Sequence, residues 1–384
     1  MLDRLLVWLM PRLARGAPGW RDLINGRYLS ALAALRREYV SAEQTPLACD
    51  FLRWALNAVD PWGSAWELTK KGILRPHAAD IVEPESLLRE AMQRHRVVVL
   101  MERHHAPETR LFGARALGWL AAAGATHLAF EHGWQASLSE FERSGIVRPS
   151  TESYAFEPSR AAILRAARSL GLRLVAFDVM VPSGVRGLDA ATRNRERERG
   201  MARNIADRIL DRYPEARVVV WTGEQHAMRH TPSGWPVDYR PYMASHLADL
   251  SGEEPFCVGQ ELVQWPQLSG KPGILVADHP WLLERGLDAM VLHHRGAEPQ
   301  RPGWLDVDSA PCPIQADGAE LVQAIAPAEG ERSVPVSQVL THGSQEVRLQ
   351  LAAGDYLLRG LRDADEVAWR RPVHHSLAAP AIGQ

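Results

Sequence analysis

The hydrophobic pattern of the chain changes near residue 93. Before it, apolar residues follow helical spacing and are interrupted by turn sequences such as RGAPGW (15–20) and VDPWGS (59–64). After it, continuous apolar runs alternate with amphipathic stretches. The runs are RVVVLME (96–102), THLAFEHG (126–133), LRLVAFDVM (172–180), ARVVVWTGEQH (216–226), PFCVGQEL (255–262) and LDAMVLHH (287–294). Continuous apolar strands separated by helices predict a mainly parallel sheet that is covered on both faces.

The last part of the chain has a different composition and residue pattern. It opens rich in proline and glycine near residue 300, and EVRLQLAAGDYLLRGL (346–361) has the pattern of a two-stranded piece of a small β module. We therefore predict an α/β layered sandwich with a mainly parallel central sheet. The predicted parts are a helical N-terminal segment (1–92), an α/β catalytic domain (93–300) and a small β-rich C-terminal module (301–384).

Composition narrows the class of protein. The 384 residues are 46% apolar and 23% charged, as in ordinary globular proteins. Lys and Arg number 44 against 46 Asp and Glu, so no overall basic field favours nucleic acid. Cys49, Cys257 and Cys312 are far apart and include no CxxC pair, which excludes a disulfide framework and a zinc knuckle. We expect a reducing, cytoplasmic location.

The N-terminal sequence MLDRLLVWLMPRLARG (1–16) contains a short apolar run. Its apolar run is too short for a secretory signal, and no run in the chain reaches the length of a membrane span. Helical spacing of its leucines favours a helix that packs on a core, and a helix at a membrane surface is the alternative.

Carboxylates and imidazoles stand where the predicted strands end. Because the carboxyl ends of parallel strands share one edge of a sheet, we expect these side chains to surround one crevice. Residues two apart in extended chain share a side, so Glu102 and His104 should point together. Structural hydrogen bonding is the alternative for each residue alone. The candidates are Glu102, His104, His105, Glu131, Asp178, Glu224 and His226.

The helical stretch RNRERERGMARNIADRIL (193–210) offers a cation. Its apolar seam runs through Met201 and Ile205, and one turn further back the seam reaches Arg197 and Glu198. An unpaired buried charge is costly, so this pair should find partners inside, whereas Arg195 and Arg199 should be solvated. A structural salt bridge is the alternative for Arg197.

Four motifs resemble, in chain order, a superfamily that unites erythromycin esterases, haem-binding ChaN-like proteins and the Tiki/TraB proteases. These proteins have a GExH-like strand end, an acidic strand end, an R(D/E)xxMAxN helix and a second strand that ends in Gly-x-x-His. The resemblance covers about residues 95–295, and Met101 stands where the first motif usually has glycine. The matching residues are Glu102, His104, Glu131, Arg197, Glu198, Met201, Ala202, Asn204, Gly223 and His226.

The resemblance implies a hydrolase that acts on an ester or amide bond of a small-molecule or peptide substrate. His104 would be the general base on water, oriented by Glu102 or Glu131, while His226 and Arg197 stabilise the oxyanion and Glu198 holds Arg197. His105 leaves open which imidazole faces the site. No cofactor is required in this interpretation. Two alternatives remain: a metallopeptidase that uses a divalent metal, as in Tiki-like proteins, or a non-catalytic binder of haem or another small molecule, as in ChaN-like proteins. The oligomeric state stays open.

Overall fold

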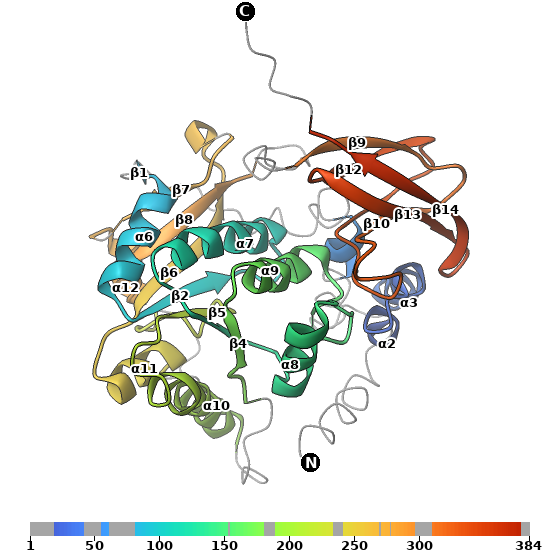
Figure 1. Ribbon diagram of the computed structural model, residues 1–384. Helices are drawn as coiled ribbons and strands as arrows, with labels where there is room; N and C mark the ends of the chain where they lie inside the picture. The colour runs from blue at the N-terminus through green and yellow to red at the C-terminus, as the bar shows by residue number, and fades with distance from the viewer. Residues whose placement is uncertain are drawn as a thin grey trace, which may run out of the picture. The chain divides into compact units, whose positions relative to one another are not determined.

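A computed structural model describes residues 19–41, 55–60, 81–152, 154–179, 189–232, 241–268, 270–276, 278–295 and 309–377 (Figure 1). The predicted N-terminal helix at residues 1–16 lies outside this range. Internal contacts divide the chain into two units. The first is Met1–Lys70, Ser144–Ala162 and Glu298–Gln384, and the second is Lys71–Arg143 and Ile163–Ala297. The N-terminal and C-terminal parts, which we predict as separate parts of the chain, belong largely to one unit.

The second unit is built on an eight-stranded sheet with strand order β1-β7-β8-β6-β2-β5-β3-β4. All pairings are parallel except β1 with β7 and β7 with β8, which confirms the mainly parallel sheet. β1 lies in a part of the chain that we expected to be helical, where it adds a short exposed edge to the sheet. The strands are β1 (Ile81–Val82), β2 (Val97–Glu102), β3 (His127–Phe130), β4 (Arg173–Ala176), β5 (Val218–Gly223), β6 (Phe256–Val263), β7 (Gly273–Leu275) and β8 (Ala289–His294).

Helices cover both faces of this sheet, which makes the layered sandwich that the sequence predicts (Figure 1). The helices that lie wholly or partly in the second unit are α6 (Pro84–Arg94), α7 (Pro107–Ala122), α8 (Gln135–Ser144), α9 (Pro158–Ser169), α10 (Ala190–Ile205), α11 (Met243–Ser251) and α12 (Pro280–Arg285). A single turn of π-helix, Ala206–Leu210, continues α10, and Pro266–Leu268 form a 3₁₀ turn.

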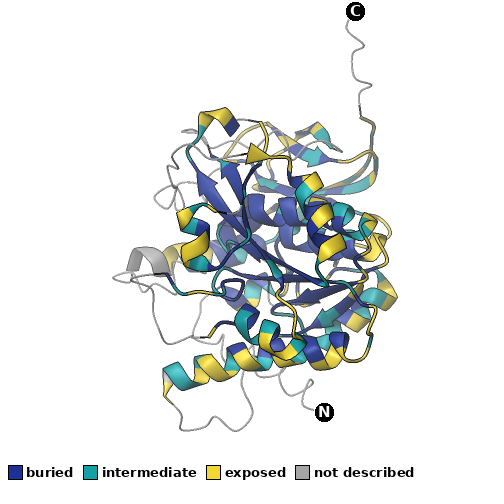
Figure 2. Cartoon of the chain, turned by 90° about the vertical axis from the view of Figure 1, so that its left-hand side faces the viewer, coloured by how far each residue is buried: buried dark blue, intermediate teal, exposed yellow. Residues whose placement is uncertain are grey.

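Alternation along the strands decides which side chains meet which helix. Val99 of β2 shares one core cluster with Met201 of α10 and Met243 of α11. Along each strand, every second side chain points to the opposite face of the sheet. On that face Trp221 of β5 lies against Gly113 of α7. Both faces of the sheet are therefore apolar, and Figure 2 shows its strands mostly in the dark blue of buried residues.

The first unit contains α2 (Trp20–Leu23), α3 (Tyr28–Ser41) and a helical turn at 55–59. Its strands are β9 (Ala310–Gln315), β10 (Leu321–Ile325), β11 (Ser337–Leu340), β12 (Glu346–Leu351), β13 (Gly354–Arg362) and β14 (Glu366–His375). They form a four-stranded sheet, β11-β10-β13-β14, and a two-stranded sheet, β12-β9. The predicted strands at 346–361 both exist, but they belong to different sheets and do not pair with each other.

Candidate functional site

The carboxyl ends of four neighbouring strands carry the polar residues of the candidate site. Glu102 is the last residue of β2, Glu131 follows β3, Asp178 lies just after β4, and His226 lies in the turn after β5. β5 pairs with both β2 and β3 in parallel register, and β3 pairs with β4. Four positions that are far apart in sequence therefore meet at one edge of the sheet, as predicted.

Glu102 and His104 form the dyad that the two-residue spacing predicts. His104 Nδ1 lies 3.0 Å from Glu102 Oε1, and Trp221 Nε1 donates to Glu102 Oε2 at 2.9 Å. The Glu102 side chain is 2% exposed and the His104 side chain is 34% exposed. An ionised carboxylate can only accept, so Nδ1 is the nitrogen of His104 that donates to it. In this dyad the buried carboxylate of Glu102 thus orients the partly exposed imidazole of His104.

Glu131 is the centre of the site. Its Oε2 accepts hydrogen bonds from Thr222 Oγ1 at 2.7 Å and from the Gly223 backbone N–H at 2.6 Å. Its Oε1 lies 3.1 Å from Arg197 Nη2 and 3.3 Å from His226 Nε2. Both oxygens of one buried carboxylate therefore connect the end of β5 with the helix that carries Arg197.

Arg197 is held mainly by Asp178. Its Nε and Nη2 donate to the two carboxylate oxygens of Asp178 at 2.9 and 3.0 Å, a bidentate pair. The Asn204 side chain donates to the Phe177 carbonyl at 2.8 Å and so ties α10 to the residue before Asp178. The Arg197 side chain is 23% exposed, whereas Arg195 and Arg199 are exposed, which confirms the inward orientation predicted from the apolar seam.

Glu198 has a different partner from the one that we expected. It does not clamp Arg197 directly; its carboxylate lies 2.7 Å from His226 Nδ1 and accepts the Met243 N–H at 2.8 Å. Met243 is the first residue of α11, and a carboxylate is favourable at a helix N-terminus. Glu198 thus orients His226 rather than Arg197. Glu224 lies 3.9 Å from Arg103, whereas the carboxylates that contact His226 are those of Glu131 and Glu198.

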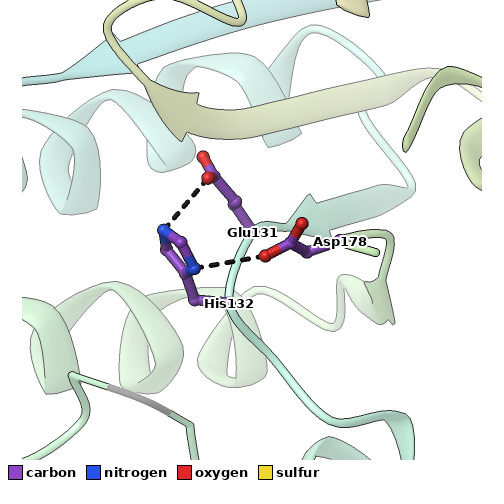
Figure 3. A group of neighbouring side chains, drawn as sticks. All are labelled: Glu131, His132 and Asp178. Carbon is purple, nitrogen blue, oxygen red and sulfur yellow. Dashed lines mark ion pairs between the residues drawn. The ribbon is translucent and has the colours of Figure 1, made fainter. Parts of the chain in front are cut away.

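His132 belongs to the site, although our list of candidate residues omits it. Its Nε2 lies 3.0 Å from Glu131 and its Nδ1 lies 3.2 Å from Asp178 (Figure 3). The backbone of His132 is left-handed, with φ 62°, a conformation that costs free energy in residues other than glycine. This conformation brings the side chain that follows Glu131 back into the cluster. A regular strand pattern would have pointed it to the opposite side.

Burial and neighbouring charges set the protonation states around Glu131. Burial alone raises the pKa of the Glu131 carboxyl, but His132 and His226 lower it more, and the pKa lies well below its usual value. Burial lowers the pKa of His226, but Glu131 and Glu198 outweigh it and raise the pKa to about 10. His226 is therefore an imidazolium at neutral pH, with hydrogen on both nitrogens.

Burial and neighbouring charges also have opposite effects on the pKa values of His132, Asp178 and Arg197. Burial lowers the pKa of His132, but Glu131 and Asp178 raise it to about 9. Burial raises the pKa of Asp178, but Arg197 and His132 bring it down to about 2. Burial lowers the pKa of Arg197, and the two carboxylates raise it more. Two cations thus bridge the same two ionised carboxylates.

The donors Glu131, His132 and Asp178 lie close enough together to be considered as a metal site. However, the two nitrogens of His132 face different carboxylates, as Figure 3 shows. One ring nitrogen can bind a given metal ion, and here the two nitrogens lie within ion-pair distance of two different carboxylates. Arg197 also occupies both carboxylates. This donor set fits an imidazolium and a guanidinium, and it does not fit a resident divalent metal.

His105 is half-buried, and the dyad contact with Glu102 is made by His104. This answers which of the two neighbouring imidazoles faces Glu102. Gly223 lies against the dyad, because a Cβ at this position would be 2.9 Å from His104 Nε2 and 3.5 Å from Glu131 Oε2. The glycine that ends β5 therefore leaves room for the imidazole beside Glu131.

No protein-family model and no curated protein matches the chain. Solved structures of bacterial effectors and toxins are similar to part of this chain, among them the following three. The type III effector HopBA1 is 12% identical, with a TM-score of 0.37 over 57% of this chain and 98% of its own. RRSP, a MARTX toxin effector domain from Vibrio vulnificus, is 15% identical, with a TM-score of 0.34 over 73% and 58%.

The third is the C-terminal region of Pasteurella multocida toxin, described as having a thiol-protease-like catalytic triad. It is 11% identical, with a TM-score of 0.33 over 53% of this chain and 29% of its own. At these scores the likeness carries no inference about activity. Among the described residues, no helix is long and apolar enough to cross a membrane.

Proposed function

We propose that the chain is a hydrolase of the erythromycin-esterase-like type that activates water against an ester or amide bond. His104 is the general base, with its Nδ1 bound to Glu102 and its side chain one-third exposed. An imidazole whose second nitrogen is fixed by a carboxylate is the arrangement that orients a histidine for proton transfer. This dyad, beside the donors of Arg197 and His226, is the observation that carries the proposal.

Arg197 and His226 stabilise the oxyanion that water attack creates. Nε and Nη2 of Arg197 donate to Asp178 and Glu131, whereas Nη1 donates to neither and lies 3.4 Å from His226 Nε2. Fixed donors at the position where negative charge develops lower the barrier without reorganisation. Water attack gives a tetrahedral intermediate, His104 takes the proton of the water, and the same proton passes to the leaving group.

The metal-dependent alternative is disfavoured by the donor set around His132, whose two nitrogens face two different carboxylates. We therefore propose catalysis that needs no metal. The haem-binding alternative predicts a different result. A protein that binds haem would give a Soret band, and a titration with hemin would reach a defined stoichiometry.

The test compares His104→Ala with His95→Ala. His95 precedes β2 and hydrogen-bonds the Glu254 carbonyl, so its removal deletes an imidazole next to the opposite end of the same strand. Both variants and the wild type are treated with a chelator and assayed on nitrophenyl esters, lactones and chromogenic peptides. We expect hydrolysis by the wild type and by His95→Ala, and a loss of about 10²–10⁴-fold in His104→Ala.

Unchanged turnover in a folded His104→Ala protein would overturn the assignment of the base, and thermal unfolding of each variant establishes that it is folded. A wild-type protein that hydrolyses no member of the panel but binds hemin stoichiometrically would replace the hydrolase proposal with the binding alternative.

A further inference from the structure

Trp221 connects two of the carboxylate residues of the site, Glu102 and Glu131. Its indole Nε1 donates to Glu102 Oε2 at 2.9 Å, and its backbone carbonyl accepts the Glu131 N–H at 3.1 Å. The side chain is fully buried. In the sequence this residue reads as one more apolar position of β5, and nothing in the strand pattern distinguishes it from a core residue.

We infer that Trp221 is a positioning residue that fixes the tautomer of His104 through Glu102. An indole N–H is a donor that neither accepts hydrogen bonds nor titrates near neutral pH. By occupying Oε2, it leaves Oε1 of Glu102 to accept from His104 Nδ1, at 3.0 Å. The neutral imidazole then carries its hydrogen on Nδ1 and its lone pair on Nε2.

The location of the indole depends on a glycine in helix α7. A Cβ added to Gly113 of α7 would overlap the six-membered ring of Trp221. Trp221 is thus held between β5 and α7 at a position where α7 has a glycine, Gly113, and no side chain. Gly118 in the same helix has open space around the corresponding atom and gives a matched comparison.

This inference rests on the proposed function for its consequence in catalysis, but the tautomer itself can be observed without a substrate. The ¹⁵N shifts of the two ring nitrogens of His104 report it in protein labelled at histidine, with His104→Gln used to assign the signals. The variants are Trp221→Phe, which removes the donor, and Gly113→Ala, which displaces the ring. Gly118→Ala is the control.

We expect the wild type and Gly118→Ala to show the Nδ1–H form of neutral His104, and both test variants to show a mixture of tautomers. Against any ester that the wild type hydrolyses, kcat should fall by about 10- to 100-fold with little change in KM, as for groups that orient histidine ligands elsewhere. A purely structural role for Trp221 would lower thermal stability and leave the tautomer unchanged, and that result overturns the inference.

A volume-conserving replacement keeps the test decisive where Trp221→Phe and Gly113→Ala fail to fold. Trp221 replaced by 3-benzothienylalanine has sulfur in place of the indole N–H and nearly the same shape. A single Nδ1–H tautomer in this folded protein would also overturn the inference. A tautomer that responds in a protein that hydrolyses nothing would retain Trp221 as the positioning residue and reject the hydrolase proposal.

Discussion

Arg197 Nη1 and His226 Nε2 lie 3.4 Å apart although both groups are cationic at neutral pH. Two donors cannot bond each other, so their proximity needs an anion between or beside them. Glu131 Oε1 supplies it, at 3.1 Å from Arg197 Nη2 and 3.3 Å from His226 Nε2. The pair is therefore held together by one buried carboxylate, and Nη1 of Arg197, which donates to neither Glu131 nor Asp178, can donate to the oxygen of a ligand.

The first prediction concerns the hydrogen bonds that the Arg197 guanidinium makes to two carboxylates at once. Arg197→Lys keeps the positive charge but cannot bond both oxygens of Asp178 and still reach Glu131. We expect kcat/KM for a hydrolysed ester to fall by about 10²–10³-fold, the range for loss of an oxyanion donor. Arg199→Lys changes an exposed residue of the same helix and serves as the control. Equal activity of the two variants would contradict the role of Arg197.

The second prediction concerns stability against pH. The folded pKa of His226 is about 10, above its ordinary value near 6.5, so the folded state holds a proton that the unfolded state loses. The stabilisation is complete below pH 6.5 and is lost as the pH rises through 10. We expect the Tm of the wild type to fall more steeply from pH 7 to 10 than that of His226→Gln. Parallel Tm curves for the two proteins would show that His226 does not hold the extra proton.

The third prediction tests the exclusion of metal. Arg197 and His132 together compensate the charges of Asp178 and Glu131, and removal of Arg197 leaves these two buried carboxylates with one bridging cation fewer. We expect Arg197→Ala to bind Zn²⁺ more tightly than the wild type in equilibrium dialysis, with Arg199→Ala as the control. Without metal, Arg197→Ala should lose about 3–5 kcal/mol of stability, because a buried pair has lost one partner. Tight Zn²⁺ binding by the wild type would reverse our interpretation of the donor set.

Sequence alone predicted which residues come to the site better than it predicted their partners. Strand ends of a parallel sheet share one edge, so Glu102, Glu131 and Asp178 could be brought together without coordinates. The helical seam likewise gave the inward direction of Arg197. These inferences need only the periods of strand and helix, which are local properties.

Partner choice depends on distances between elements, which no local pattern contains. For example, Glu198 pairs with His226 and not with its chain neighbour Arg197. His132 enters the site through a left-handed backbone, a conformation that strand periodicity does not predict. Trp221 reads as a core residue because its N–H has no effect on hydrophobic periodicity. The β12 and β13 strands were located correctly but assigned to one sheet instead of two.

The last prediction uses the close approach of Gly223 to His104. Gly223→Ala places a Cβ 2.9 Å from His104 Nε2, closer than carbon and nitrogen can pack, so the imidazole must move. The backbone at Gly223 has no positive φ, so an alanine there meets no backbone strain, and the whole effect comes from this contact. Thr222 and the Gly223 N–H should keep their bonds to Glu131.

We therefore expect Gly223→Ala to retain a cooperative unfolding transition and to lose most of its hydrolytic activity, with Gly118→Ala as a glycine control that alters neither. The His104 ring signals should shift in Gly223→Ala, because the movement weakens the 3.0 Å contact with Glu102. Full activity together with unshifted ring signals would place His104 away from Gly223, and the arrangement of the dyad beside Glu131 would then be wrong. A shifted ring with full activity would instead leave the geometry intact and remove His104 from the reaction.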